Sequence, residues 1–149
     1  MRQFLLDTNI FIAYARNQQP LIQQIEQKLD ISNPTNLTML SVVTQAECMA
    51  FALKNHWGDS KKQALTRILN VCLVIDIHSS STQLLQAYAE IDAFSAFKLA
   101  KKPASSGAIR MGKNDLWIAA TAHLLQAELI TTDGDFDHLD GHYLTLHRF

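Results

Sequence analysis

Residues 4–12 read Phe-Leu-Leu-Asp-Thr-Asn-Ile-Phe-Ile, and they set a short apolar run directly before a polar helix start. The apolar run at 4–6 predicts a buried strand, which ends at Asp7. Thr8 or Asn9 can then cap a helix that we expect to continue to about residue 16. A strand that leads so abruptly into a helix is typical of α/β proteins, where such junctions lie at one edge of a sheet.

The rest of the chain repeats this alternation of strands and helices. We expect further strands at about 37–43, 71–77, 129–131 and 143–146, and the apolar run at 71–77 is typical of a buried parallel strand. Helices are predicted at about 20–29, 44–56, 59–70, 81–97 and 114–126. Because parallel strands need such connections, we predict a single α/β domain over residues 1–149, with a mainly parallel sheet covered by helices on both faces.

The composition excludes several classes of protein. Of the 149 residues, 48% are hydrophobic and 18% are charged, so the chain can bury a core and is not typical of a disordered protein. Cys48 and Cys72 form no CxxC motif, so neither a disulfide framework nor a zinc site is indicated. No run approaches the roughly 20 apolar residues of a membrane span, and the N-terminus lacks the apolar stretch of a signal peptide. We therefore expect a cytoplasmic protein that does not bind a membrane.

Acidic and basic residues are segregated along the chain, although its formal net charge is only −1. Four aspartates fall within 133–140. By contrast, the stretch between Asp92 and Asp115 contains no acid and carries five basic residues: Lys98, Lys101, Lys102, Arg110 and Lys113. This pattern predicts an acidic pocket beside a basic approach.

Four acids far apart in the sequence are predicted to meet at one edge of the sheet. Asp7 follows the first strand and Asp133 the fourth, while Glu47 and Asp115 lie early in helices. Ligands of such sheets bind outside the carboxyl ends of the strands. Two carboxylates about 5 Å apart repel each other by roughly 3 kcal/mol at an effective dielectric near 20, and a shared cation removes that cost. Oxygen ligands favour Mg²⁺ or Mn²⁺ over zinc.

Four motifs resemble those of PIN-domain proteins, and in particular VapC-type toxin ribonucleases of type II toxin–antitoxin systems. They are FLLDTNIFI at 4–12, TQAECMA at 44–50, KNDLWIAATA at 113–122 and LITTDGDFDHL at 129–139. The resemblance implies a three-layer α/β/α PIN-like domain. It also implies a Mg²⁺- or Mn²⁺-dependent endoribonuclease that hydrolyses RNA phosphodiester bonds with a water molecule activated by the metal.

The resemblance also implies residue roles. Asp7, Glu47, Asp115 and Asp133 match the acidic quartet that holds the metal and performs catalysis, with Glu47 either binding a second metal or orienting the attacking water. Thr8 and Thr132 would orient carboxylates through their hydroxyls, and Asn9 would do the same or cap its helix. Asp135 is the alternative to Asp133, and Asp92 either reaches the pocket or lies on a solvated helix face.

The basic stretch has two interpretations. Either it is a solvated loop, or its cations bind the RNA backbone, because phosphate contacts supply most sequence-independent affinity for nucleic acid. The candidate RNA-binding residues are Lys101, Lys102, Arg110, Lys113 and Asn114.

The expected partners and the rival functions complete the hypothesis. The resemblance implies a homodimer and a small antitoxin protein whose tail enters the acidic site. The apolar residues of the helix at 20–29 are either a docking surface or part of the core. Two alternatives remain open: a phosphoacceptor signalling domain that binds Mg²⁺, and a catalytically silent PIN scaffold that binds a partner.

Overall fold

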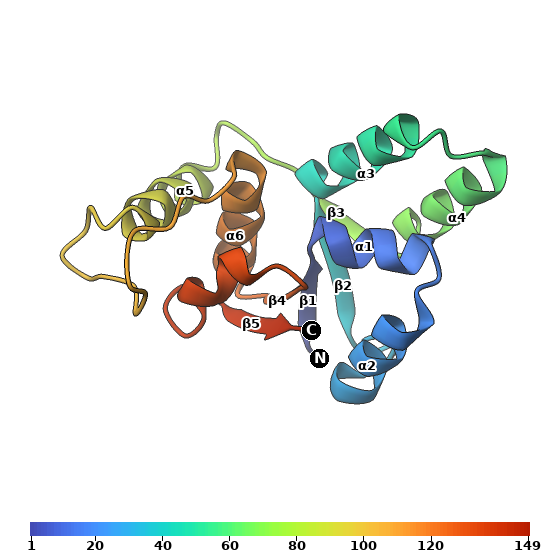
Figure 1. Cartoon of the computed structure of the whole chain (residues 1–149), viewed down its shortest axis with the longest axis horizontal. Helices are drawn as coiled ribbons and strands as arrows, with labels where there is room; N and C mark the ends of the chain where they lie inside the picture. The colour runs from blue at the N-terminus through green and yellow to red at the C-terminus, as the bar shows by residue number, and fades with distance from the viewer.

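Five short strands form one parallel sheet in the order β3-β2-β1-β4-β5. The computed structural model describes residues 1–149, and Figure 1 follows the chain through it. The strands are β1 Gln3–Leu6, β2 Leu37–Ser41, β3 Leu73–Ile75, β4 Glu128–Thr131 and β5 Thr145–Arg148. In the centre of the sheet, Leu5 of β1 is aligned with Met39 of β2 and Leu129 of β4. The predicted parallel sheet is confirmed.

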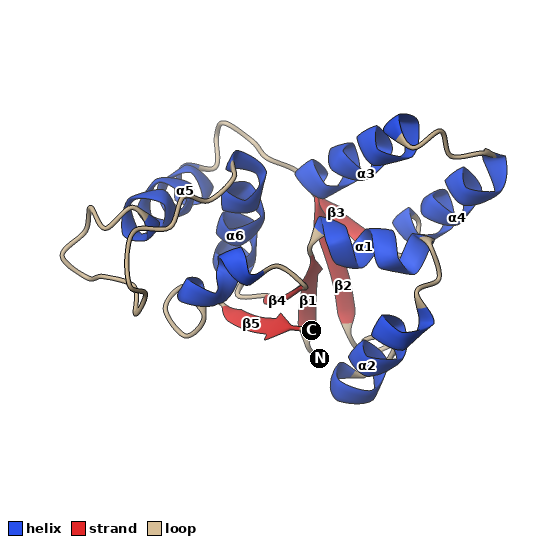
Figure 2. Ribbon diagram, viewed as in Figure 1, coloured by secondary structure: helices blue, strands red, loops and turns tan.

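Helices cover both faces of the sheet (Figure 2). They are α1 Thr8–Ala15, α2 Gln19–Leu29, α3 Val42–Lys54, α4 Asp59–Leu69, α5 Thr82–Ser95 and α6 Lys113–Leu125, with a short 3₁₀ helix, η1, at Gly134–Leu139. No helix is both long enough and apolar enough to span a membrane.

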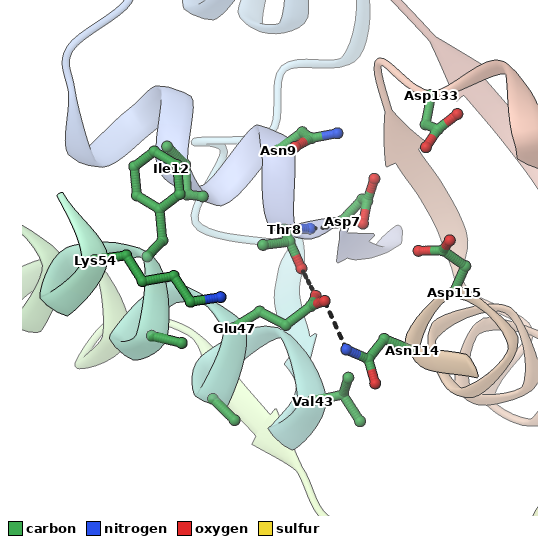
Figure 3. Close-up of a pocket in the computed structure, with 13 residues that line it drawn as sticks. Asp7, Thr8, Asn9, Ile12, Val43, Glu47, Lys54, Asn114, Asp115 and Asp133 are labelled. Carbon is green, nitrogen blue, oxygen red and sulfur yellow. Dashed lines mark hydrogen bonds between the residues drawn. The ribbon is translucent and has the colours of Figure 1, made fainter. Parts of the chain in front are cut away.

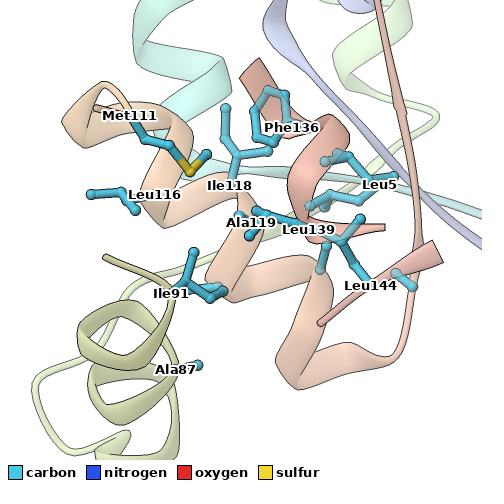
Figure 4. Close-up of a cluster of buried hydrophobic side chains, with 14 of the residues drawn as sticks. Leu5, Ala87, Ile91, Met111, Leu116, Ile118, Ala119, Phe136, Leu139 and Leu144 are labelled. Carbon is cyan, nitrogen blue, oxygen red and sulfur yellow. The ribbon is translucent and has the colours of Figure 1, made fainter. Parts of the chain in front are cut away.

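The alternation of side chains along β1 separates the two cores. Phe4 and Leu6 point to one face, where they join buried side chains from α1 to α4. Leu5 points to the other face and packs with residues of α5, α6 and η1, among them Ile91, Leu116 and others drawn in Figure 4. These two cores and the sheet between them make up the predicted three-layer α/β/α fold.

The expectation of a buried strand at 71–77 is wrong. Only Leu73–Ile75 form a strand, and β3 pairs with β2 alone at the edge of the sheet. Val71 is 78% exposed and Leu73 is 50% exposed. An apolar run indicates a preference for a strand, but it does not indicate how many other strands and helices cover that strand.

Two helix starts differ from the prediction. The side chain of Asp7, rather than that of Thr8 or Asn9, caps α1 by accepting a hydrogen bond from the Thr8 N–H. Gly112 occupies the cap position of α6, so Asn114 lies inside the first turn. Neither Thr8 nor Asn114 caps its helix, and both side chains lie at the cavity at the carboxyl edge of the sheet.

Helix α2 contributes to the core rather than only to the surface. Ile25 and Leu29 are buried, and Leu21 packs against the same cluster. The inner face of this helix is therefore used within the protomer.

An ion-pair network ties the first residues of the chain to the last strand, at the end of the sheet opposite the acidic motifs. Arg2 donates from Nε to Oε1 of Glu128 at 2.8 Å and from Nη2 to Oε2 at 2.6 Å. His147 donates to the same Oε2. The hydrogen bonds from Arg2 lower the pKa of Glu128 to about 2, against an opposing effect of burial and with further help from His147.

Replacement of Glu128 by Gln should destabilise the protein in a pH-dependent way. A carboxyl whose pKa is lowered by folding stabilises the protein above its unfolded pKa of 4.5, and this contribution is lost as the pH falls toward 2. The difference in unfolding free energy between wild type and Glu128→Gln should therefore be largest above pH 5 and shrink in acid. Urea denaturation across this range measures it, with Asp76→Asn as the control because Asp76 is exposed. A pH-independent difference would contradict the ion-pair explanation.

Candidate active site

Asp7 lies where β1 ends and α1 begins, and its carboxylate is held in place from two sides. Its Oδ1 accepts the Thr8 N–H at 2.7 Å, and its Oδ2 accepts the Thr131 hydroxyl at 2.7 Å. The residue is only 3% exposed. Burial raises the pKa of Asp7, the two hydrogen bonds oppose that rise, and the charges of Asp133 and Glu47 add to it.

The hydroxyl that orients Asp7 belongs to Thr131, whereas the sequence analysis assigns such a role to Thr132. Thr131 is buried at the end of β4, next to β1, while Thr132 is exposed. The same Thr131 hydroxyl accepts the Asp133 N–H at 2.9 Å. One side chain therefore links the two strand ends that carry Asp7 and Asp133. The alternation of strand side chains decides which of two adjacent threonines faces inward.

Three aspartates gather on the α6 side of this edge. One carboxylate oxygen each from Asp115, Asp133 and Asp135 lies within 4.8 Å of the other two. Asp133 caps η1 and accepts the Asp135 N–H at 2.9 Å. The structure thus brings both candidates for the fourth acid close to Asp115, but only Asp133 lines the cavity that also contains Asp7 and Glu47.

Glu47 comes from the first half of α3, and two polar neighbours hold its carboxylate. The Thr8 hydroxyl donates to Oε2, and the Asn114 amide donates to Oε1 at 2.7 Å. The Thr8 hydroxyl thus orients the carboxylate of Glu47. From Thr8, the carboxylate of Asp7 accepts a hydrogen bond from the backbone N–H alone. Asn114, which the sequence predicts as an RNA contact, links α6 to Glu47 across the site.

These residues line a cavity of about 630 Å³ (Figure 3). The carboxylates of Asp7, Asp115 and Asp133 face a common space, and Asn9 lies at its rim. Several carboxylates around one space fit a hard divalent cation such as Mg²⁺ or Mn²⁺, because their oxygens are the ligands such ions prefer.

Asp115 has a pKa raised well above its ordinary value of 3.8. It lies in the first turn of α6, and burial raises its pKa to about 6, with added repulsion from Asp7, Asp133, Glu47 and Asp135. A carboxyl with a pKa near 6 still ionises at neutral pH, although burial and the negative charges of the neighbouring acids oppose its ionisation. A bound cation would relieve that repulsion.

The remaining charged candidates lie elsewhere. Lys101, Lys102 and Arg110 are exposed on the loop between α5 and α6, which projects on the α5 side of the molecule (Figure 1). The Lys102 ammonium donates to the Phe97 carbonyl. Lys113 is exposed at the first position of α6. Asp92 is exposed on α5 and does not line the cavity.

A family model describing the PIN domain matches residues 4–142. The chain belongs to the PIN-domain family. The four sequence motifs therefore identified the family correctly, and the acids of the PIN-domain protein lie at the carboxyl edge of its sheet, where those motifs converge. No curated protein matches the chain.

Solved toxin–antitoxin structures share this fold. VapBC2 from Rickettsia felis, solved with a DNA fragment from its promoter, is 22% identical with a TM-score of 0.75 over 98% of each chain. VapBC-1 from nontypeable Haemophilus influenzae is 24% identical with a TM-score of 0.71 over 98% of this chain and 97% of that chain. VapBC-5 from Mycobacterium tuberculosis is 25% identical with a TM-score of 0.65 over all of both chains.

Asp115→Asn should stabilise the metal-free PIN-domain protein at neutral pH. Folding raises the pKa of Asp115 from 3.8 to about 6, so the ionised carboxylate destabilises the fold increasingly as the pH rises through this interval. We expect a gain on the order of 1 to 2 kcal/mol above pH 7, allowing for solvent screening, and none below pH 4. Denaturation in EDTA measures this gain. A loss of stability at pH 8 would show that Asp115 is not repelled by its neighbours.

Gly112→Ala should damage the site without damaging the fold. A Cβ at position 112 would lie 2.8 Å from Oδ2 of Asp115, so the carboxylate would have to turn away. We expect an unchanged melting temperature in EDTA and a weaker stabilisation by added Mn²⁺. Gly58→Ala is the matched control, because Gly58 also caps a helix and a Cβ there meets nothing within 4 Å. Equal Mn²⁺ effects in both variants would contradict this role for Gly112.

Proposed function

We propose that this PIN-domain protein is a Mg²⁺- or Mn²⁺-dependent endoribonuclease and the toxin of a type II toxin–antitoxin pair. One observation carries the proposal: Asp7, Glu47, Asp115 and Asp133, from four separate segments, line one cavity. Such a cluster is costly without a cation and well suited to one. The similarity to solved VapBC proteins supports the toxin role.

The residues divide into metal ligands and groups that orient them. Asp7, Asp115 and Asp133, with Asp135 as the alternative, would hold the cation. When bound, the cation supplies Lewis-acid stabilisation of the scissile phosphate and lowers the pKa of a coordinated water. The Thr131 hydroxyl keeps one Asp7 oxygen facing β4, which leaves the geometry of this ligand fixed before substrate arrives.

Glu47 is placed to act on water. Its two carboxylate oxygens already accept hydrogen bonds from Thr8 and Asn114, and these bonds fix the side chain at the cavity wall. Remaining lone pairs on the same oxygens can orient a water molecule for attack in line with the departing 3′-oxygen. The products would be a 5′-phosphate and a 3′-hydroxyl.

The partners follow from the surfaces around the site. We propose RNA as the substrate, with Lys101, Lys102, Arg110 and Lys113 as contacts to the phosphates of the RNA backbone. We also propose an antitoxin partner whose tail blocks the acidic cavity. A homodimer is supported by Met49 and Leu53 on the outer face of α3, which are 54% and 68% exposed in the single chain. The protein would act in the cytoplasm.

The strand order disfavours a phosphoacceptor signalling domain. Such domains use the order 2-1-3-4-5, whereas this sheet has the order 3-2-1-4-5. In addition, the acid after β3, Asp76, is exposed at the edge of the sheet and far from a central strand. A silent PIN scaffold is the remaining rival, and an activity assay separates it from a nuclease.

Purified protein should cleave a pool of cellular RNA with Mn²⁺ or Mg²⁺ and not with EDTA. Asp7→Asn should reduce cleavage by at least about 100-fold, because it removes a charged ligand while keeping the shape of the side chain. Asp76→Asn, prepared identically, should cleave like wild type. Equal cleavage by wild type and Asp7→Asn would indicate a contaminant or a wrong assignment. Metal binding without cleavage of any RNA would favour the silent scaffold.

A further inference from the structure

The cavity continues beyond the carboxylates as an apolar groove between α1 and α3. Between Glu47 and Lys54 it is lined by Ile12 from α1 and by Ala50 and Phe51 from α3, whereas Val43 and Ala46 line the cavity on the other side of Glu47. Positions 43, 46, 47, 50, 51 and 54 recur at three- and four-residue spacing, so they share one face of α3. The groove therefore leads away from the acids along the helix.

Lys54 stands at the far end of the groove and is the only basic residue that lines the cavity. It lies seven residues after Glu47, which corresponds to about 10 Å along the axis of α3. Its side chain runs back along the groove, with the ammonium toward Glu47 (Figure 3). No acid of the chain forms a salt bridge with Lys54. A cation is thus left free to bind an anion within the cavity.

Phe51 supplies an aromatic surface one turn before Lys54. Its ring packs edge to face against Trp57, with the ring centroids 5.6 Å apart and the planes at 84°. Trp57 is buried, whereas Phe51 remains partly exposed at the cavity. The contact with Trp57 fixes the ring, so a planar group could stack on Phe51 at little cost in side-chain entropy.

We propose that this groove is a nucleotide subsite beside the cleavage site: an unpaired base packs on Phe51 and Ile12, and its phosphate binds Lys54. The inference rests on the proposed function and assigns Phe51 and Lys54 to the binding of the substrate. Bases in a duplex are stacked and paired, so their faces cannot reach an aromatic ring. An aromatic ring and an ammonium without a salt-bridge partner, in one groove, match a base and its phosphate.

The chemistry of this wall suits the face of a base. Ile12, Ala50 and Phe51 offer no polar side-chain group between Glu47 and Lys54. The face of a base needs no hydrogen bond, so it can pack on such a wall without leaving a polar group unpaired.

The test measures binding of a fluorescein-labelled dodecauridylate by fluorescence anisotropy, with Ca²⁺ present and KCl varied from 50 to 200 mM. Lys54→Gln should weaken binding about five- to tenfold at 50 mM and lower the slope of log K against log[salt] by about 0.7, the value for one phosphate contact on a single strand. Lys62→Gln is the matched control, because Lys62 is exposed on α4 outside the cavity.

Phe51→Leu should weaken binding at least about fivefold without changing the salt slope, because stacking releases no counterion. Phe51→Tyr keeps an aromatic face and should bind like wild type, and melting temperatures verify that each variant is folded. With the dodecauridylate–dodecaadenylate duplex, Lys54→Gln and Phe51→Leu should bind like wild type.

Several results would overturn the subsite. The first is that wild type does not bind dodecauridylate. The second is that Lys54→Gln and Lys62→Gln have the same affinity and salt slope, and the third is that Phe51→Leu keeps full affinity. Unchanged RNA binding with weaker binding of a model peptide of alternating glutamate and leucine would assign the groove to a protein partner. Cleavage assays with Mg²⁺ and Mn²⁺ run in parallel. If wild type cleaves while the groove variants match it, only the subsite fails; if wild type cleaves no RNA, the proposed function fails.

Discussion

The mutual repulsion of carboxylates at the end of the sheet is the constraint on which the site depends. Asp7 is almost fully buried, and burial raises its pKa, yet two donors hold the carboxylate in a single orientation. The Thr131 hydroxyl has a central part, because it donates to Asp7 and accepts from the Asp133 backbone. The energy stored in this arrangement is available to a cation, which binds where the negative charges already lie.

The strand order makes this arrangement possible. β1 pairs directly with β4, and Leu6 is aligned with Ile130, so the residues that follow these two strands lie side by side. Glu47 and Asp115 then arrive from α3 and α6, which cover opposite faces of the sheet, and Asn114 joins these helices by its hydrogen bond to Glu47. The site therefore lies at the boundary between the two helical layers, and neither layer contains it alone.

The sequence predicted the order of elements, the parallel sheet and the family because these follow from periodicity and from local motifs. It could not predict that β3 is a half-exposed edge, since coverage depends on elements distant in sequence. The sequence could not indicate that Thr131, rather than the predicted Thr132, contacts Asp7, because two adjacent threonines look alike until strand register is known. The contact of Asn114 with Glu47 spans 67 residues, and no local pattern indicates it. Lys54 resembles an ordinary basic residue at a helix end.

The proposed subsite explains how an acidic centre can accept a polyanion. Without a cation the four carboxylates repel phosphate, so affinity must come from groups outside the quartet. The groove offers such groups on one side through Phe51 and Lys54, and the loop between α5 and α6 offers further cations on the other. A strand that passes across the boundary between the helical layers would contact both. Its scissile phosphate then lies over the carboxylates, where repulsion is strongest and a metal contributes most.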